Sequence, residues 1–214
     1  MLNILCGKSG CGKDTLLNEL KKEGFIPLIS TTSRPMREGE TNGVEYNFTT
    51  KEDFQEKIKK GDFIEYRVYN TLVNGEKDTW YYGMPKQPLD LNKEYLVILD
   101  MGGTKDFLEA YGKDQCFVCY IETNDALRKE RASARGSFDE TEWNRRLADD
   151  KVKFSDEIIT SLANTRISNN GCTIDALKQL FYDAKTEYRL EQEAKRFRNE
   201  QTYQADMENY DPEY

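Results

Sequence analysis

Short apolar runs alternate with amphipathic segments over most of the chain. Four runs have the length and composition of buried strands and a fifth is shorter, at residues 2–6, 25–29, 95–99, 116–121 and 165–168. Apolar residues at every third or fourth position, typical of helices packed on a sheet, lie at about 13–22, after 124 and from 174 towards 200. This alternation predicts an α/β fold with a mainly parallel sheet of about five strands and helices on both faces.

Residues 31–90 interrupt this alternation. A long polar loop is expected from Ser30 to Glu45, and a short helix after Thr50. Residues 62–69 alternate as a strand, and Asn74-Gly75 predicts a hairpin turn into a returning strand at 79–83. The region therefore predicts a small mixed β/α subdomain that projects from the core.

Nine residues after the first apolar run carry the clearest chemical signal, Gly7-Lys8-Ser9-Gly10-Cys11-Gly12-Lys13-Asp14-Thr15. They contain G-x-x-x-x-G-K, the phosphate loop between a strand and a helix. Glycines allow consecutive backbone N–H groups to converge on a phosphate, and Lys13 adds a mobile positive charge. Asp14 stands where Ser or Thr usually holds Mg²⁺, so Thr15 supplies the hydroxyl one residue late. The loop predicts an ATP site that includes Ser9, Gly10, Cys11, Gly12, Lys13, Asp14 and Thr15.

Composition excludes several classes of function. The 214 residues carry a net charge of −8, which argues against general binding to nucleic acid. No histidine is present, so His-based acid–base catalysis and His-ligated metal sites are excluded. The five cysteines lack the spacing of a disulfide framework, and Cys116 and Cys119 are expected to be buried thiols in a strand. With no long apolar segment, we expect a cytoplasmic protein without a membrane partner.

Four further stretches resemble the signature of guanylate kinases, namely Ser30–Glu40, Asn42–Phe48, Gly61–Glu65 and Tyr82-Gly83. The resemblance runs from about residue 2 to 182 and is densest between 30 and 66. It implies a P-loop kinase fold in a single domain over residues 1–202. The core would comprise 1–30 and 91–200, the nucleoside-monophosphate subdomain about 31–90, and a mobile lid about 131–146. Residues 203–214 are expected to be an acidic, mobile tail.

The resemblance also implies roles for individual residues. Glu65 would accept hydrogen bonds from the N1–H and amino groups of guanine, since a carboxylate offers only acceptors. The wider acceptor site would comprise Ser30, Arg34, Arg37, Tyr46, Glu65, Tyr82, Gly83, Met84 and Asp100. Residues acting on the transferred phosphoryl group would be Lys13, Arg34, Arg131, Arg135 and Arg146, whereas Arg128 and Arg145 are expected to be solvated. Asn169 or Asn170 would contact adenine. Asp14 and Asp100 would bind Mg²⁺ through water, with Mg²⁺ as the cofactor of ATP.

Three positions depart from the family pattern. Met84 stands where Ser or Thr usually donates to the guanine carbonyl, and Gly102 stands where a second Asp is typical. The stretch from Tyr69 to Thr79 is longer than usual. These departures leave the identity of the acceptor base open.

We therefore expect an enzyme that phosphorylates GMP or dGMP with ATP, as a monomer or small homo-oligomer. One alternative is a kinase of another (deoxy)nucleoside monophosphate, because the Gly-Lys-Asp-Thr ending also resembles some viral-type deoxynucleotide kinases. Another is a non-catalytic module that binds phosphorylated protein segments. Such modules usually lose the loop lysine and the lid arginines, whereas Lys13, Arg131 and Arg135 are present.

Overall fold

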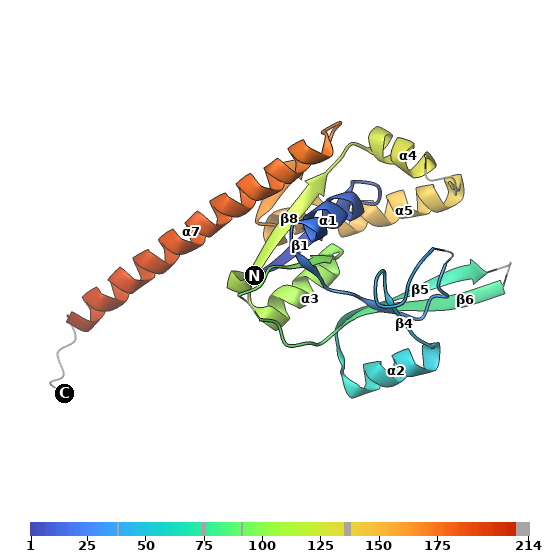
Figure 1. Ribbon diagram of the computed structural model, residues 1–214, viewed down its shortest axis with the longest axis horizontal. Coiled ribbons are helices and arrows are strands. Elements are labelled where there is room, and N and C mark those ends of the chain that lie inside the picture. The colour runs from blue at the N-terminus through green and yellow to red at the C-terminus, as the bar shows by residue number, and fades with distance from the viewer. Residues whose placement is uncertain (38, 74–75, 91, 135–137, 209–214) are drawn as a thin grey trace.

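A five-stranded parallel sheet forms the centre of the computed structural model, which describes residues 1–37, 39–73, 76–90, 92–134 and 138–208 (Figure 1). Its strands are β1 (Leu2–Cys6), β2 (Ile26–Pro27), β7 (Tyr95–Ile98), β8 (Cys116–Glu122) and β9 (Thr165–Ser168). Their order is β2-β7-β1-β8-β9, and each neighbouring pair runs parallel. The predicted sheet is confirmed, although β2 is shorter than the apolar run at 25–29.

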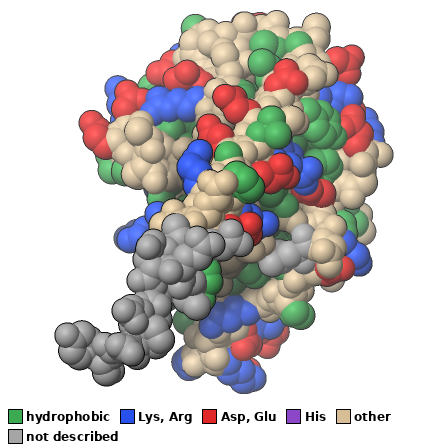
Figure 2. Space-filling model, turned by 90° about the vertical axis from the view of Figure 1, so that its left-hand side faces the viewer, with side chains coloured by type: hydrophobic (Ala, Val, Ile, Leu, Met, Phe, Trp, Pro, Cys, Tyr) green, Lys and Arg blue, Asp and Glu red, His purple; other side chains and the backbone are tan. Residues whose placement is uncertain are grey.

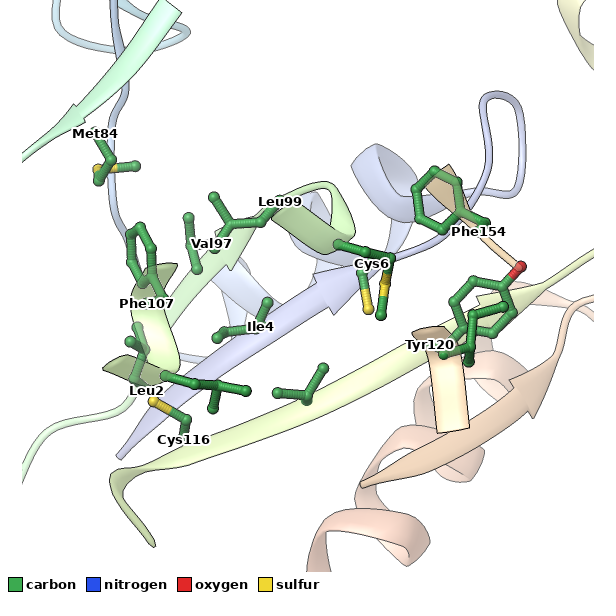
Figure 3. Packing of buried hydrophobic residues seen from close by; sticks show 14 residues of the cluster. Leu2, Ile4, Cys6, Met84, Val97, Leu99, Phe107, Cys116, Tyr120 and Phe154 are labelled. Carbon is green, nitrogen blue, oxygen red and sulfur yellow. The ribbon is translucent and has the colours of Figure 1, made fainter. Parts of the chain in front are cut away.

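Both faces of this sheet are buried, which explains why its strands read as continuous apolar runs. Successive residues of a strand point to opposite faces. Alternate residues of β1 and β8, such as Ile4 and Tyr120, therefore join one buried cluster (Figure 3), while Leu5 and Phe117 join another. Cys116 and Cys119 are buried free thiols, as predicted. Burial raises the pKa of Cys116 to about 12.

Helices cover the two faces in separate groups. Residues of α3 (Met101–Tyr111) and α6 (Asp156–Leu162) pack into the first cluster, together with Phe154, which directly follows α5 (Glu140–Lys153). Residues of α1 (Lys13–Lys22) and α7 (Ile174–Glu208) pack into the second. The core also contains α4 (Asp125–Ser133) and a 3-10 turn, η1 (Lys113–Gln115).

The segment between β2 and β7 forms a second, mixed sheet. Its strands are β3 (Thr31–Thr32), β4 (Asn47–Phe48), β5 (Phe63–Val73) and β6 (Glu76–Pro85), in the order β4-β3-β6-β5. Thr50 caps the N-terminus of helix α2 (Lys51–Lys60), where its side chain accepts a hydrogen bond from the backbone N–H of Asp53. Strand β3 lies within the stretch predicted to be a loop. The predicted turn at 74–75 lies outside the described residues.

This sheet and the α4–α5 pair extend from the same end of the core, and α7 projects in the opposite direction (Figure 1). Helix α7 has 35 residues and includes residues 203–208, which the sequence analysis placed in the tail. Its first half buries Leu177, Phe181 and Tyr188, whereas Leu190 and Phe197 further along are exposed.

The surface is mixed in charge. On the face shown in Figure 2, acidic and basic side chains are interspersed. Among the helices that the structure describes, none combines the length and apolar composition needed to cross a membrane.

The packing of α7 against the parallel sheet can be tested by mutation. Phe181 is fully buried, with its ring centroid 6.0 Å from that of Phe25 and 5.7 Å from that of Phe117. We expect Phe181→Ala to lower the free energy of unfolding by about 3–5 kcal/mol in urea titrations. Phe197→Ala removes the same atoms from a side chain that is 61% exposed, and should change it by less than about 0.5 kcal/mol. Equal losses in the two variants would contradict this packing.

Candidate functional site

A cavity of about 1730 Å³ opens at the carboxyl-terminal edge of the parallel sheet. Ligands of open α/β sheets bind at this edge. Phosphate-loop residues, the second sheet and α5 all line the cavity. It brings together predicted donor-side and acceptor-side residues, namely Ser9, Lys13, Ser30, Arg34, Arg37, Tyr46, Glu65, Tyr82, Asp100 and Arg146.

Asn169, which directly follows β9, anchors the phosphate loop. Gly12 has φ 103°, a left-handed conformation that favours glycine, and a Cβ there would lie 2.5 Å from Nδ2 of Asn169. That Nδ2 donates to the carbonyl of Cys11 at 2.8 Å, and Asn169 is only 5% exposed. Asn170 instead accepts from the backbone N–H of Asn124, at the start of α4. Their contact with adenine stays a prediction.

Lys13 and Arg131, which the sequence assigned to the phosphates, both lie at this loop. The Nζ of Lys13 donates to the carbonyls of Gly7 at 2.7 Å and Lys8 at 3.1 Å, so it bends back over the loop. Arg131 donates from Nη2 to the carbonyl of Asn169 at 3.2 Å. Its Nη1 is buried without a hydrogen-bond partner among the described residues, 3.9 Å from the Cβ position of Gly12. An unsatisfied guanidinium nitrogen beside a phosphate loop suits an anionic ligand.

Two further arginines complete the predicted lid set. Arg146 projects from α5, lines the cavity and is exposed. Arg135 lies outside the described residues, so its predicted role and the lid itself stay predictions.

The prediction that Arg128 is solvated is wrong, because its side chain is fully buried. Its Nε donates to the carbonyl of Ser9 at 2.7 Å, and its guanidinium forms an ion pair with Asp150. Asp150 accepts from the backbone N–H of Ser9 at 3.1 Å. The guanidinium also lies 5.5 Å from the ring centroid of Trp143 on α5. The two charged side chains thus hold both polar groups of the Ser9 backbone and connect α4 and α5 to the phosphate loop.

On the acceptor side, Arg34 is held in a fixed orientation. It is 3% exposed, donates to Glu40 at 2.7 Å, and lies 5.5 Å from the ring centroids of Tyr46 and Phe48. Burial raises the pKa of the Tyr46 hydroxyl, which therefore stays protonated and can donate to an anion. Arg37 is exposed on the same loop, and its backbone N–H donates to Glu40 at 2.7 Å.

Two carboxylates, Glu65 and Asp100, also line the cavity. Burial raises the pKa of Glu65 to about 7, and the nearby Arg67 opposes that rise. Asp100 begins α3, where its Oδ1 accepts from the backbone N–H of Gly103 at 2.8 Å. Arg67, which sequence analysis did not select, lies 3.5 Å from Glu65 and 3.6 Å from Asp100.

Gly83 and Met84, which were predicted for the acceptor site, are not among the residues that line the cavity. A Cβ at Gly83 would lie 3.0 Å from the carbonyl oxygen of Glu65. Met84 is fully buried, and its side chain belongs to the core cluster with Val97 and Phe107 (Figure 3). Its side chain therefore faces the core and not the cavity.

The carboxylates of Asp14 and Asp100 fit a metal ion that binds together with a nucleotide. Within the residues that the structure describes, no group of three or more potential ligands forms a metal cage. Asp14 is exposed on the first turn of α1, and Asp100 lines the cavity. Mg²⁺ is commonly held by one or two carboxylates together with substrate phosphates, so this donor set suits it.

Comparison with known proteins decides the family. The guanylate kinase family model matches residues 2–157. The guanylate kinase of Clostridium tetani is 31% identical over 201 residues, which cover 83% of this chain and 90% of that protein. The chain belongs to the guanylate kinase family. The guanylate kinase of Helicobacter pylori strain 26695 is also 31% identical, over 78% of this chain and 87% of its own.

A solved member of the guanylate kinase family supports the fold. The crystal structure of guanylate kinase from Anaplasma phagocytophilum matches this structure with a TM-score of 0.57 at 22% sequence identity. The match covers 90% of this chain and 86% of that one. The family resemblance and the P-loop kinase fold are therefore confirmed.

The buried Arg128–Asp150 pair can be tested by stability measurements. Arg128→Met leaves the Asp150 carboxylate without its guanidinium, and loss of one buried partner costs about 3–5 kcal/mol of unfolding free energy. The double variant Arg128→Met/Asp150→Asn removes both charges and should recover most of that loss. Arg145→Met breaks an exposed ion pair with Asp149 and should cost less than about 1 kcal/mol. A double variant no more stable than Arg128→Met would contradict the pairing.

Proposed function

We propose that this protein transfers the γ-phosphoryl group of ATP to GMP or dGMP, giving ADP and the corresponding diphosphate. One observation carries the proposal. A single cavity is lined by the phosphate loop with Lys13 and, across from it, by Arg34, Tyr46 and Glu65. Membership of the guanylate kinase family, and the guanylate kinases among its relatives, support the same reaction.

On the donor side, the loop and the start of α1 bind the β- and γ-phosphates. Backbone N–H groups at a helix N-terminus favour anions, and Lys13 exchanges its loop carbonyls for phosphate oxygens. Arg131 supplies the unpartnered Nη1 to the same phosphates. Asp14 and Asp100 would hold Mg²⁺ through water, and the bound ion would supply positive charge to the phosphate oxygens of ATP.

On the acceptor side, Arg34, Arg37, Tyr46 and Ser30 hold the monophosphate. Its attacking oxygen already carries charge near neutral pH, because the second pKa of a phosphate monoester is about 6. The reaction therefore needs no general base, which agrees with a chain that lacks histidine. Catalysis then consists of positioning two nucleotides and stabilising charge on the transferred group.

Closure completes the site. The second sheet and α5 both line the cavity, and α5 carries Arg146. We propose that these parts approach each other when both nucleotides bind. Closure brings Arg146 to the transferred group and excludes water, which would otherwise hydrolyse ATP.

A kinase of another nucleoside monophosphate is the second candidate. The buried position of Met84 favours it, because that side chain gives no hydrogen-bond donor to the guanine carbonyl. A phosphopeptide-binding module is less well supported, because Lys13 and Arg131 both lie at the phosphate loop.

An acceptor panel tests the proposal. With Mg²⁺ and ATP, the purified protein should phosphorylate GMP or dGMP faster than AMP, CMP, UMP or dTMP, measured as initial rates of ADP formation. A different acceptor that turns over faster would establish the second candidate. Binding of a phosphorylated peptide without turnover of any nucleotide would establish the module.

The raised pKa of Glu65 gives a pH dependence. Below about pH 7 the carboxyl becomes protonated, and its O–H then faces donors of the base. The KM for GMP should therefore rise as pH falls from 8 to 6, by about tenfold at one unit below the pKa. Glu65→Gln should have a higher KM that varies only with the titration of the GMP phosphate. An identical pH profile in both proteins would show that Glu65 does not contact the base.

A further inference from the structure

Arg67 lines this cavity, and no motif in the sequence accounts for it. It lies two residues after Glu65 on β5, so the two side chains share one face of the strand. Tyr69 follows on the same face, and all three line the cavity. Across the sheet, Arg67 stands opposite Tyr82 on β6. Its position is therefore within the acceptor half of the site.

Arg67 is held in place from several directions. Its Nη2 lies 3.1 Å from Asp106 in the middle of α3 and 3.6 Å from Asp100, which caps the start of that helix. Its Nη1 donates to the backbone carbonyl of Tyr66 at 2.9 Å. Fixed contacts of this kind orient a guanidinium more sharply than its long stem alone would.

Gly102 makes room for this arrangement. A Cβ at position 102 would lie 2.6 Å from Nη2 of Arg67 and 3.5 Å from its Cζ. The next glycine differs, because a Cβ at Gly103 would meet Leu99 and Asp100 at ordinary distances of 3.4–3.5 Å. The lack of a side chain at position 102 therefore leaves the space that the guanidinium of Arg67 occupies.

The pair of Glu65 and Arg67 matches the hydrogen-bonding edge of guanine. Guanine presents its O6 acceptor beside the N1–H and amino donors, so a complementary site needs one donor next to two acceptors. The Glu65 carboxylate offers the acceptors, and Nη1 of Arg67 lies 3.5 Å from its Oε2. Arginine is a common partner of guanine O6 in proteins that read this base. Met84 faces the core and offers no donor.

We propose that Arg67 determines base specificity by donating a hydrogen bond to guanine O6, while Glu65 accepts from N1–H and the amino group. This inference rests on the proposed function and names the residue that replaces the missing hydroxyl at 84. Adenine places an amino group where guanine has O6, so it meets the guanidinium donor to donor. Thymine and uracil retain a carbonyl for Arg67 but set another carbonyl against the carboxylate. The pair therefore selects guanine over all three.

The test compares GMP with 6-thio-GMP, whose sulfur is a much weaker acceptor than O6. In the wild-type protein kcat/KM should be higher for GMP. Arg67→Met should lower kcat/KM for GMP by about ten- to a hundredfold, the range for a hydrogen bond to a charged group. It should change 6-thio-GMP little, so the preference disappears. Arg67→Lys should recover part of that preference. Arg166→Met on β9, which breaks an ion pair with Asp156 on α6, should leave kcat/KM unchanged for both substrates.

Gly102→Ala tests the same inference without removing the arginine. The added methyl group displaces Nη2 of Arg67, so the preference for GMP should fall, while alanine raises helix propensity at this position. Gly103→Ala adds the same methyl group one residue further along α3, beside Leu99 instead of Arg67, and should preserve the preference.

The outcomes separate the inference from the function on which it rests. Parallel losses for GMP and 6-thio-GMP in Arg67→Met would indicate a structural role and overturn the inference, as would an unchanged preference. In both cases the proposed function stands, because the wild-type protein phosphorylates GMP. Failure of the wild-type protein to phosphorylate GMP or dGMP would overturn both together.

Discussion

The backbone of the phosphate loop and the contacts that hold it set the positions of the charges on the donor side of the cavity, including Lys13 and Arg128. The loop is short and connects the central strand β1 directly to α1, so its geometry depends on contacts with the elements packed around it. Asn169 binds the carbonyl of Cys11 from the end of β9, and Arg128 with Asp150 holds both polar groups of Ser9. A phosphate loop must present its N–H groups together, and these anchors fix them before any nucleotide binds.

The cavity also shows how charges can be buried before ligands arrive. Arg34 is paired with Glu40, and Arg67 with Asp100 and Asp106. Lys13 is bound to loop carbonyls. Each cation therefore has a partner that offsets the cost of its desolvation. Substrate phosphates and bases can then replace or share these partners without a large rearrangement. The buried carboxyl of Glu65 is compensated less completely, and its pKa accordingly rises to about 7.

The sequence predicted the elements whose signal is local. Lys13–Lys22 is helical over the expected residues, and apolar runs mark β1, β7 and β8 because both sheet faces are covered. Arg128 was misassigned because its partner Ser9 lies 119 residues away, and no local pattern separates it from exposed arginines. Arg67 was missed for the same reason, since Asp106 is 39 residues distant. Met84 and Gly102 were recognised as departures, but only the fold shows that one faces the core and the other makes room for Arg67.

The most direct test of the account measures ADP formation from Mg-ATP, with and without GMP, in the wild-type protein and in Lys13→Met. Lys13 is central because its Nζ is bound to the loop carbonyls of Gly7 and Lys8, and phosphate oxygens of ATP would replace these carbonyls as its partners. GMP should greatly accelerate ADP formation by the wild-type protein, and Lys13→Met should lower kcat at least about 100-fold with an unchanged unfolding transition. ADP formation that does not depend on GMP, or a folded Lys13→Met protein with wild-type turnover, would contradict phosphoryl transfer at this loop.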